Sequence, residues 1–193
     1  MLAAAAAVLS VGAMASCVSF PAAELDAGFT ASDQVIVCGQ SSIRVENTDY
    51  TDNGKGGAFP LDFVRVLDDA ERAFAAAYPK VPMKPWLLSA GADSTEEARK
   101  GLTEKSRLIF LSVTAEKDNI GLSSKPTYQL LARIQLIVTD GAGKDIVAYP
   151  PYTQSFRYDW NAFRSNPVSV LPSYRAAVVQ TVRDFVQDLK SHM

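Results

Sequence analysis

The only histidine in this chain of 193 residues is His192, which is next to last in the sequence. Chain ends usually fray, so neither a Ser-His-Asp triad nor a typical zinc site is expected. The sequence has no S-x-x-K motif for a Ser/Lys nucleophile. Neighbouring acids such as Asp68 and Asp69 fall on a predicted helix, where adjacent positions do not face each other. We therefore expect no enzyme, no metal and no cofactor, although folding could still bring two distant acids into a working pair.

Aromatic and charged side chains alternate in one segment near the C-terminus, which is the strongest candidate for binding. Aromatic residues and arginines dominate binding hot spots because they combine a large contact area with directional polar groups. The candidate binding residues are Tyr152, Phe156, Arg157, Tyr158 and Trp160. On a strand, the four aromatic candidates would share one face and Arg157 would lie on the other. Two interpretations stay open: the aromatic face is core beneath a helix, or the strand projects past the sheet beyond Pro150 and Pro151 and docks a protein or a glycan.

The composition is that of an ordinary globular protein. With a formal net charge of -2 and 21% charged residues, the chain is too weakly charged to indicate a nucleic-acid partner. Its Val, Leu, Ile and Phe content argues against a disordered chain. The length fits one domain.

The first 16 residues are predicted to be an export signal. Residues 2–15 form an uncharged apolar run with the length of a signal-peptide core, too short to span a bilayer comfortably. The stretch Ala13–Cys17 resembles the bacterial lipobox, in which small residues precede a cysteine. The resemblance implies that Cys17 is the lipidated N-terminus of the mature protein and holds it on a membrane. Val18 stands where the enteric inner-membrane retention signal has Asp, so the resemblance favours the outer membrane, with the protein facing the periplasm.

Cleavage after Ala15 by ordinary signal peptidase is the alternative, since Ala13 and Ala15 form an A-x-A pattern. The protein would then diffuse in the periplasm, and a bridge between Cys17 and Cys38 would become possible. Lipidation instead leaves Cys38 alone, and we interpret it as a small residue in a strand.

The chain is divided into a signal peptide over 1–16, a lipid-anchored tether over 17–33 and a single α+β domain over 34–193. Residues 19–33 are small and polar with no sustained hydrophobic period, which is typical of a flexible spacer.

Hydrophobic periodicity predicts the elements that position the candidate residues. Strand patterns cover 34–45, 107–118, 127–140 and 145–160, the last two as an antiparallel hairpin. Amphipathic helices are predicted over 61–77 and from Pro172 onward, with a short helix over 94–100, an extra short strand at 86–89 and a loop over 47–60. The expected fold is a two-layer α+β sandwich. Two amphipathic helices cover one face of a mostly antiparallel sheet of four to five strands and leave the other face to water or a partner.

In element order, the chain after residue 34 is similar to small outer-membrane assembly lipoproteins. That similarity carries no specific motif, so it transfers no residue role. We expect a non-enzymatic scaffold or accessory subunit of an envelope assembly or transport machine, held on the membrane by its lipid and in contact with an envelope protein. The alternatives are a binding module for peptidoglycan, lipopolysaccharide or another glycan, and a hydrolase with an unrecognised carboxylate site.

Overall fold

The computed structural model describes residues 22–45, 48–51, 63–88, 94–119, 128–142 and 152–191. The helices are α1 (Ala22–Thr30), α2 (Phe63–Ala77), α3 (Ser94–Arg99), α4 (Trp160–Ser165), the 3-10 turn η1 (Pro167–Val170) and α5 (Leu171–Ser191). The strands are β1 (Val35–Val45), β2 (Thr48–Thr51), β3 (Met83–Leu87), β4 (Arg107–Asn119), β5 (Tyr128–Asp140) and β6 (Tyr152–Asp159). The predicted signal segment 1–16, Cys17, Pro150, Pro151 and His192 lie outside the described residues.

Six strands form one mixed sheet in the order β2-β1-β4-β5-β6, and β3 also pairs with β1. The pairs β1/β2, β4/β5 and β5/β6 are antiparallel, whereas β1 runs parallel to both β3 and β4. The mostly antiparallel sheet and the final hairpin are thus confirmed. The short β2 falls in the predicted loop over 47–60, because its Thr and Tyr residues suit a strand and pair back onto the end of β1.

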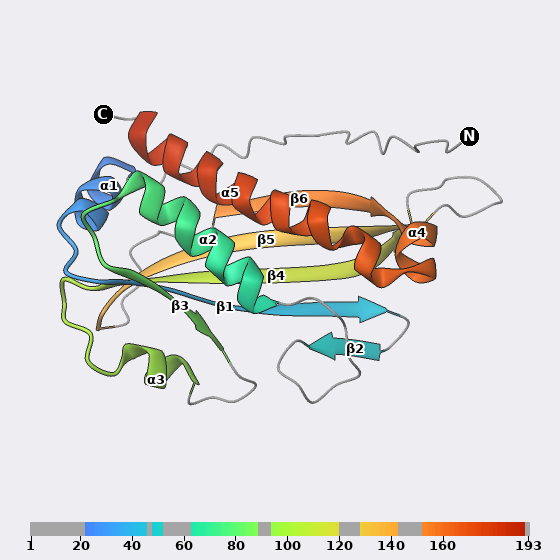
Figure 1. Ribbon diagram of the computed structural model, residues 1–193, viewed down its shortest axis with the longest axis horizontal. Coiled ribbons are helices and arrows are strands. Elements are labelled where there is room, and N and C mark those ends of the chain that lie inside the picture. The colour runs from blue at the N-terminus through green and yellow to red at the C-terminus, as the bar shows by residue number, and fades with distance from the viewer. Residues whose placement is uncertain are drawn as a thin grey trace.

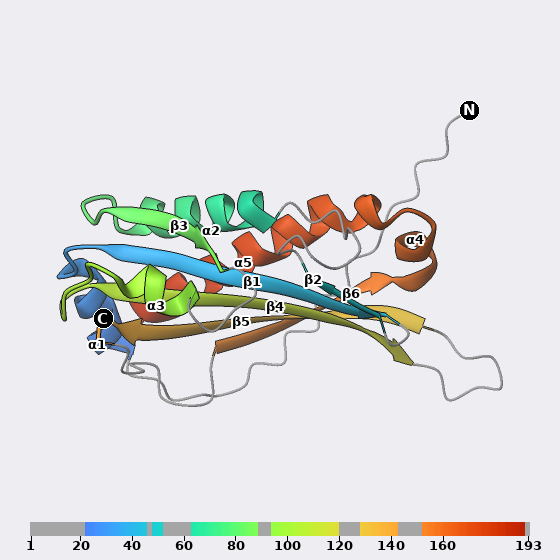
Figure 2. The ribbon, with the colours of Figure 1, turned by 90° about the horizontal axis from the view of Figure 1, so that it is seen from below.

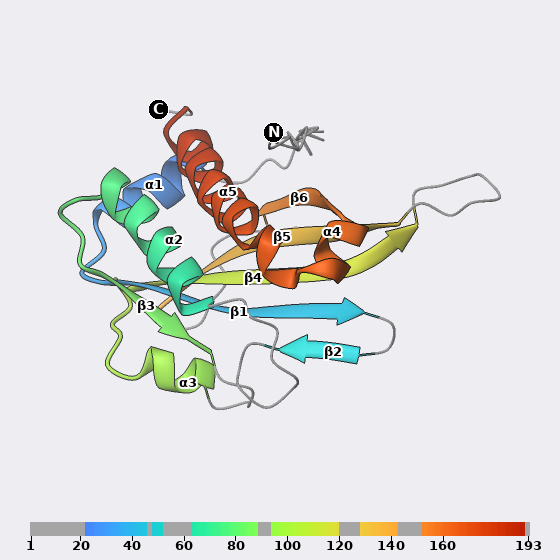
Figure 3. The same ribbon diagram turned by 45° about the vertical axis from the view of Figure 1, so that its right-hand side comes forward.

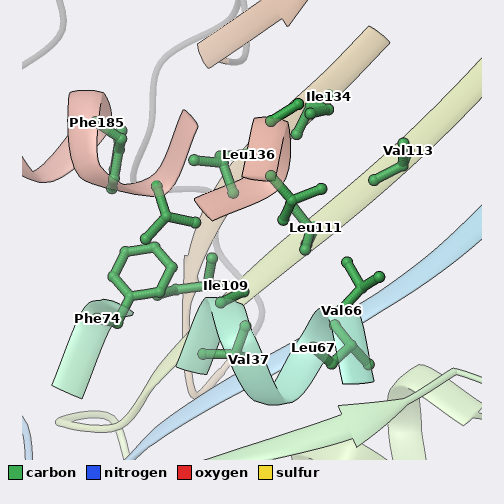
Figure 4. Packing of buried hydrophobic residues seen from close by; sticks show 14 of the residues in the cluster. Val37, Val66, Leu67, Phe74, Ile109, Leu111, Val113, Ile134, Leu136 and Phe185 are labelled. Carbon is green, nitrogen blue, oxygen red and sulfur yellow. The ribbon is translucent and has the colours of Figure 1, made fainter. Parts of the chain in front are cut away.

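Two long helices cover one face of the sheet, as predicted. Figures 1 and 2 show α2 and α5 side by side on the same side of the strands. Phe74 of α2 and Phe185 of α5 lie edge to face at 6.1 Å above the strand residues Val37, Ile109 and Leu136 (Figure 4). Burial of these apolar faces is the main driving force for the sandwich. The predicted two-layer α+β class is confirmed.

Part of the segment that was predicted to be a flexible tether is a helix, because Ala22–Thr30 forms α1. Leu25 and Phe29 are buried in the same core as α2 and α5, and the Phe29 ring lies 6.3 Å from that of Phe74. Buried positions spaced by three or four residues describe one face of a short helix. The folded domain therefore begins at or before Ala22 rather than at residue 34.

Among the described residues, α3 and Leu88 cover one end of the opposite face of the sheet. Ile36, Cys38 and Leu108 point away from α2 and α5, because neighbouring strand residues face opposite sides. They form a second, smaller cluster with Ala98 of α3 and with Leu88. The remainder of this face carries no helix in the described part of the chain.

The aromatic strand ends one residue earlier than predicted. Asp159 caps α4 by accepting a 2.7 Å hydrogen bond from the backbone N–H of Ala162, a typical helix N-cap. Trp160 therefore opens α4 instead of ending the strand. Figure 3 shows α4 at one end of the sandwich and α1 at the other.

Candidate functional site

The strand that carries the candidate binding residues does not project past the sheet. Every residue of β6 pairs with a residue of β5, from Tyr152 opposite Leu136 to Asp159 opposite Gln129. The expectation that this strand projects past the sheet is therefore wrong for the described residues, whereas docking of a partner by its side chains stays a prediction.

The four aromatic candidates lie on the core side of β6 and α4. Tyr158 and Trp160 are buried, and Tyr152 and Phe156 pack against the same core. The Tyr152 ring is edge-on to Phe185 at 5.3 Å, and the Tyr152 hydroxyl donates a 3.2 Å hydrogen bond to Asp188. These four side chains therefore belong to the core beneath the helices, which is the first of the two interpretations. Binding of a partner through their rings stays a prediction.

Trp160 also belongs to a cation–π cluster at the α4 end of the sandwich. The Lys117 ammonium lies 4.8 Å from the Trp160 ring centroid and 4.3 Å from that of Tyr128. A cation between two aromatic faces stabilises both contacts. The cluster fixes α4 against the ends of β4 and β5, which is a structural role.

Arg157 is the one candidate on the open side of the sheet. Its side chain is 45% exposed, and its guanidinium donates a 2.8 Å hydrogen bond to Asp118 on β4. Leu131 of β5 is paired with Arg157 on one side and with Glu116 of β4 on the other, and it is buried. A second pair, Arg133 with Glu116, lies alongside at 2.8 Å.

Apart from Phe110 and Ile137, the partly or fully exposed residues of this side of the sheet are polar, and we call these polar residues the open sheet face. It consists of Gln40, Ser112, Thr114, Glu116, Asp118, Arg133, Gln135, Thr153, Ser155 and Arg157. Antiparallel sheets commonly present such a face to water. Its rows of hydroxyl, amide, carboxylate and guanidinium groups give a surface with many hydrogen-bond donors and acceptors.

A groove lies on the other side of the molecule, along the boundary between α2 and α5, and we call it the helix groove. It has a volume of about 590 Å³ and is lined by Asp69, Ala73, Pro172, Arg175, Ala176, Val179, Gln180 and Arg183. The Arg175 Nε and Nη2 atoms both contact Oδ2 of Asp69, at 2.7 and 2.6 Å, and join the two helices. The sequence did not indicate this groove, since its two walls are about a hundred residues apart in the chain. The small residues Ala73, which is partly buried, and Ala176, which is exposed, are the only signal that could have suggested it.

The titratable groups of the described residues differ in burial and in hydrogen bonding. Within the described ranges, no group of three or more His, Cys, Asp or Glu residues is placed to hold a metal ion. Burial raises the pKa of the Cys38 thiol to about 12, so it stays protonated at neutral pH. The pKa of Asp33 is lowered by hydrogen bonds from Thr103 and Ser106, contacts that hold the 101–106 turn in place. In the part of the chain that the structure covers, no helix is both long and apolar enough to cross a membrane.

The fold and these surfaces define a small α+β domain with one open sheet face and one groove between helices. No protein-family model matches the sequence, and no curated protein matches it. Among solved structures, the chain is similar to a minor lipoprotein from Acinetobacter baumannii, with 8% identity and a TM-score of 0.44 over 83% of this chain and 94% of that one. It is similar to a PelC dodecamer subunit from Paraburkholderia phytofirmans, with 15% identity and a TM-score of 0.39 over 79% and 87% of the two chains. It is also similar to the rare lipoprotein B from Shewanella oneidensis, with 10% identity and a TM-score of 0.36 over 81% and 95%. With TM-scores below 0.5, these likenesses carry no functional argument.

Proposed function

We propose that this protein is a bacterial envelope lipoprotein, anchored through Cys17, that serves as a non-enzymatic scaffold or accessory subunit of an envelope assembly or transport machine. The observation that carries the proposal is the short distance in sequence between the lipobox-like cysteine and the folded domain. Only residues 18–21 separate Cys17 from Ala22, where α1 begins. Fully extended, five residue steps span at most about 18 Å.

This short link sets the orientation of the domain on a membrane. Leu25 and Phe29 bury α1 in the core, so α1 is a fixed point from which the lipid extends. The α1 end of the sandwich then lies next to the bilayer, and the α4 end points away from it (Figure 3). The 13 residues of β4 extend about 40 Å, which leaves the open sheet face and the helix groove accessible along their length.

The open sheet face supports a protein partner better than a glycan. Glycan binding was expected to use exposed aromatic rings, but Tyr158 and Trp160 are buried. The face instead offers Arg157 and Arg133, each paired with a carboxylate that a partner can replace. Since exposed ion pairs contribute little to stability, these arginines are free to change partners at small cost.

The first test is the intact mass of the mature protein from bacterial membranes, with Cys17→Ser beside the wild type. The expected result is a mass equal to residues 17–193 plus acyl chains, lost in the variant together with membrane association. An unmodified chain that begins at Ser16 would contradict the anchor and indicate a diffusible periplasmic protein.

A second test addresses the scaffold role in intact cells. A photo-crosslinking residue placed at Thr114 or Ser155, both exposed on the open sheet face, is expected to give a defined protein adduct. The same residue at Gln187, exposed on α5, is the control and should not give that adduct. The adduct should also decrease with Arg157→Glu, while the circular dichroism spectrum of the purified variant stays unchanged. Equal labelling from all three positions would speak against a specific partner on this face.

A further inference from the structure

The helix groove carries a pattern on α5 that the fold itself does not use. The residues of α5 that face the core include Tyr174, Val178, Val182, Phe185 and Leu189. On the same helix the groove is lined by a separate set, Pro172, Arg175, Ala176, Val179, Gln180 and Arg183. Within this set, Pro172, Ala176, Val179 and Arg183 are spaced by four, three and four residues, which is the repeat of a seam between packed helices.

The floor of the groove suits close approach of another helix. Ala73 of α2 and Ala176 of α5 are small, and Val179 of α5 adds a further apolar side chain to the lining. Small residues at such positions let the side-chain ridge of a third helix settle between two others. From Pro172 to Arg183 the groove follows eleven residue steps of α5, which correspond to about 16 Å or three helical turns.

The charges along the groove indicate which partner would fit. Asp69 is neutralised by Arg175 at one end, and Gln180 donates a 2.7 Å hydrogen bond to Asp184 beside the groove. Arg183 is exposed and forms no ion pair with any described residue. The groove therefore presents one uncompensated positive charge next to an apolar floor.

We infer that the helix groove binds an amphipathic helix of a protein partner, which places apolar side chains on Ala73, Ala176 and Val179 and a carboxylate on Arg183. Helix-in-groove recognition uses this combination of apolar anchors at helical spacing and a charge at the rim. The inference goes beyond the lipid anchor and the open sheet face and holds without them, since the groove lies on the opposite side of the sheet.

The test uses the full-length protein in its native cells, with a photo-crosslinking residue at Ala176 inside the groove. The matched control has the same residue at Gln187, which is also exposed on α5 but does not line the groove. The expected adduct forms from position 176 only. Mass spectrometry of the adduct is expected to place the crosslinked peptide in a helix of another protein with Asp or Glu within one turn.

Charge reversal then tests the role assigned to Arg183. Arg183→Glu is expected to lower the adduct yield about tenfold, and Asp or Glu→Arg in the partner should restore it. Arg72→Glu, at an exposed α2 position outside the groove lining, should leave the yield unchanged. If Arg183→Glu proves unfolded by circular dichroism, Arg183→Gln supplies the same comparison with a smaller perturbation.

The inference would be wrong if position 176 gave an adduct only to lipid or to a second copy of this chain. It would also be wrong if positions 176 and 187 gave equal adducts, or if neither gave any. An adduct yield that Arg183→Glu leaves unchanged would contradict the role of Arg183. Failure of the proposed lipid anchor would not produce any of these results, because a periplasmic domain without lipid still folds and keeps the groove. The Cys17→Ser experiment therefore tests the anchor separately.

Discussion

The Tyr78 hydroxyl donates a 2.7 Å hydrogen bond to Oδ1 of Asp26, and this contact joins α1 to the residue that follows α2. Both side chains are buried, and the Phe29 ring lies 5.3 Å from that of Tyr78. The Lys190 ammonium lies 5.1 Å from the Tyr78 ring and donates to the carbonyl of Ala77. One tyrosine thus holds three helices together at the end of the sandwich where the chain enters.

Tyr78→Phe is expected to lower the free energy of unfolding by about 1–3 kcal/mol, because it leaves the buried Asp26 carboxyl without its donor. Urea denaturation followed by circular dichroism measures the change. Thr30→Ala is the control, because Thr30 is an exposed residue of α1, the helix that contains Asp26. Its free energy of unfolding should stay within about 0.5 kcal/mol of the wild type. If the two variants are equally stable, the contact does not hold α1 in place.

Removal of α1 is expected to destabilise the domain by more than about 3 kcal/mol, since loss of a buried Phe such as Phe29 alone costs about 3–5 kcal/mol. Chains that begin at Ser19 and at Asp33 can be compared by thermal denaturation and by binding of a hydrophobic dye. The shorter chain should melt at lower temperature and bind the dye. Identical melting would support the interpretation of the whole 17–33 segment as a tether.

Alkaline pH is expected to destabilise the fold, because burial raises the pKa values of Tyr152 and Cys38 to about 12 and also raises that of Tyr158. The folded state keeps these protons, while the unfolded state loses them above its ordinary values of 9.0 for Cys and 10.0 for Tyr. The free energy of unfolding should therefore not change through these groups below about pH 9. Above that pH it falls by about 1.4 kcal/mol per pH unit for each group that is deprotonated in the unfolded state but still protonated in the folded state.

Tyr158→Phe provides a sharp check on this effect. The Tyr158 hydroxyl is buried and has no hydrogen-bond partner among the residues that the structure describes, so its removal should leave stability at pH 7 unchanged or raise it by about 1 kcal/mol. Urea denaturation at several pH values should also show a smaller alkaline loss than in the wild type. A variant less stable at pH 7 would mean that this hydroxyl has a partner in solution.

Gly39→Ala is expected to destabilise the sheet by about 1–3 kcal/mol through overpacking. A Cβ at Gly39 would lie 2.4 Å from the backbone oxygen of Leu111, its partner on β4. Gly28→Ala is the matched control, because the nearest atoms are the flexible Arg107 guanidinium at 3.4 Å and alanine favours a helix. Differential scanning calorimetry should show a lower melting temperature for Gly39→Ala alone. Equal melting would mean that β1 and β4 can separate locally without cost.

Periodicity in the sequence was enough to predict the two long helices, the central strand, the final hairpin and the two-layer class. Apolar residues repeated every two or every three to four positions, and burial of one face follows directly from such a repeat. Periodicity was not enough to predict α1. Its nine residues are too few to show a clear repeat, and its apolar face is recognised only from the packing of Leu25 and Phe29 against α2 and α5. Nor could periodicity determine the partners of β1, because parallel pairing with β3 and β4 depends on segments far away in the chain.

The candidate surfaces divide in the same way. The sequence by itself determined that Cys17 follows a lipobox-like segment and that aromatic residues and Arg157 alternate along one strand. Only the tertiary structure decided that α5 covers the aromatic side, that Arg157 lies on the open sheet face, and that Ala73 and Ala176 border one groove. The physical reason is that a local pattern shows which face of an element is apolar, whereas long-range packing decides what that face is buried against.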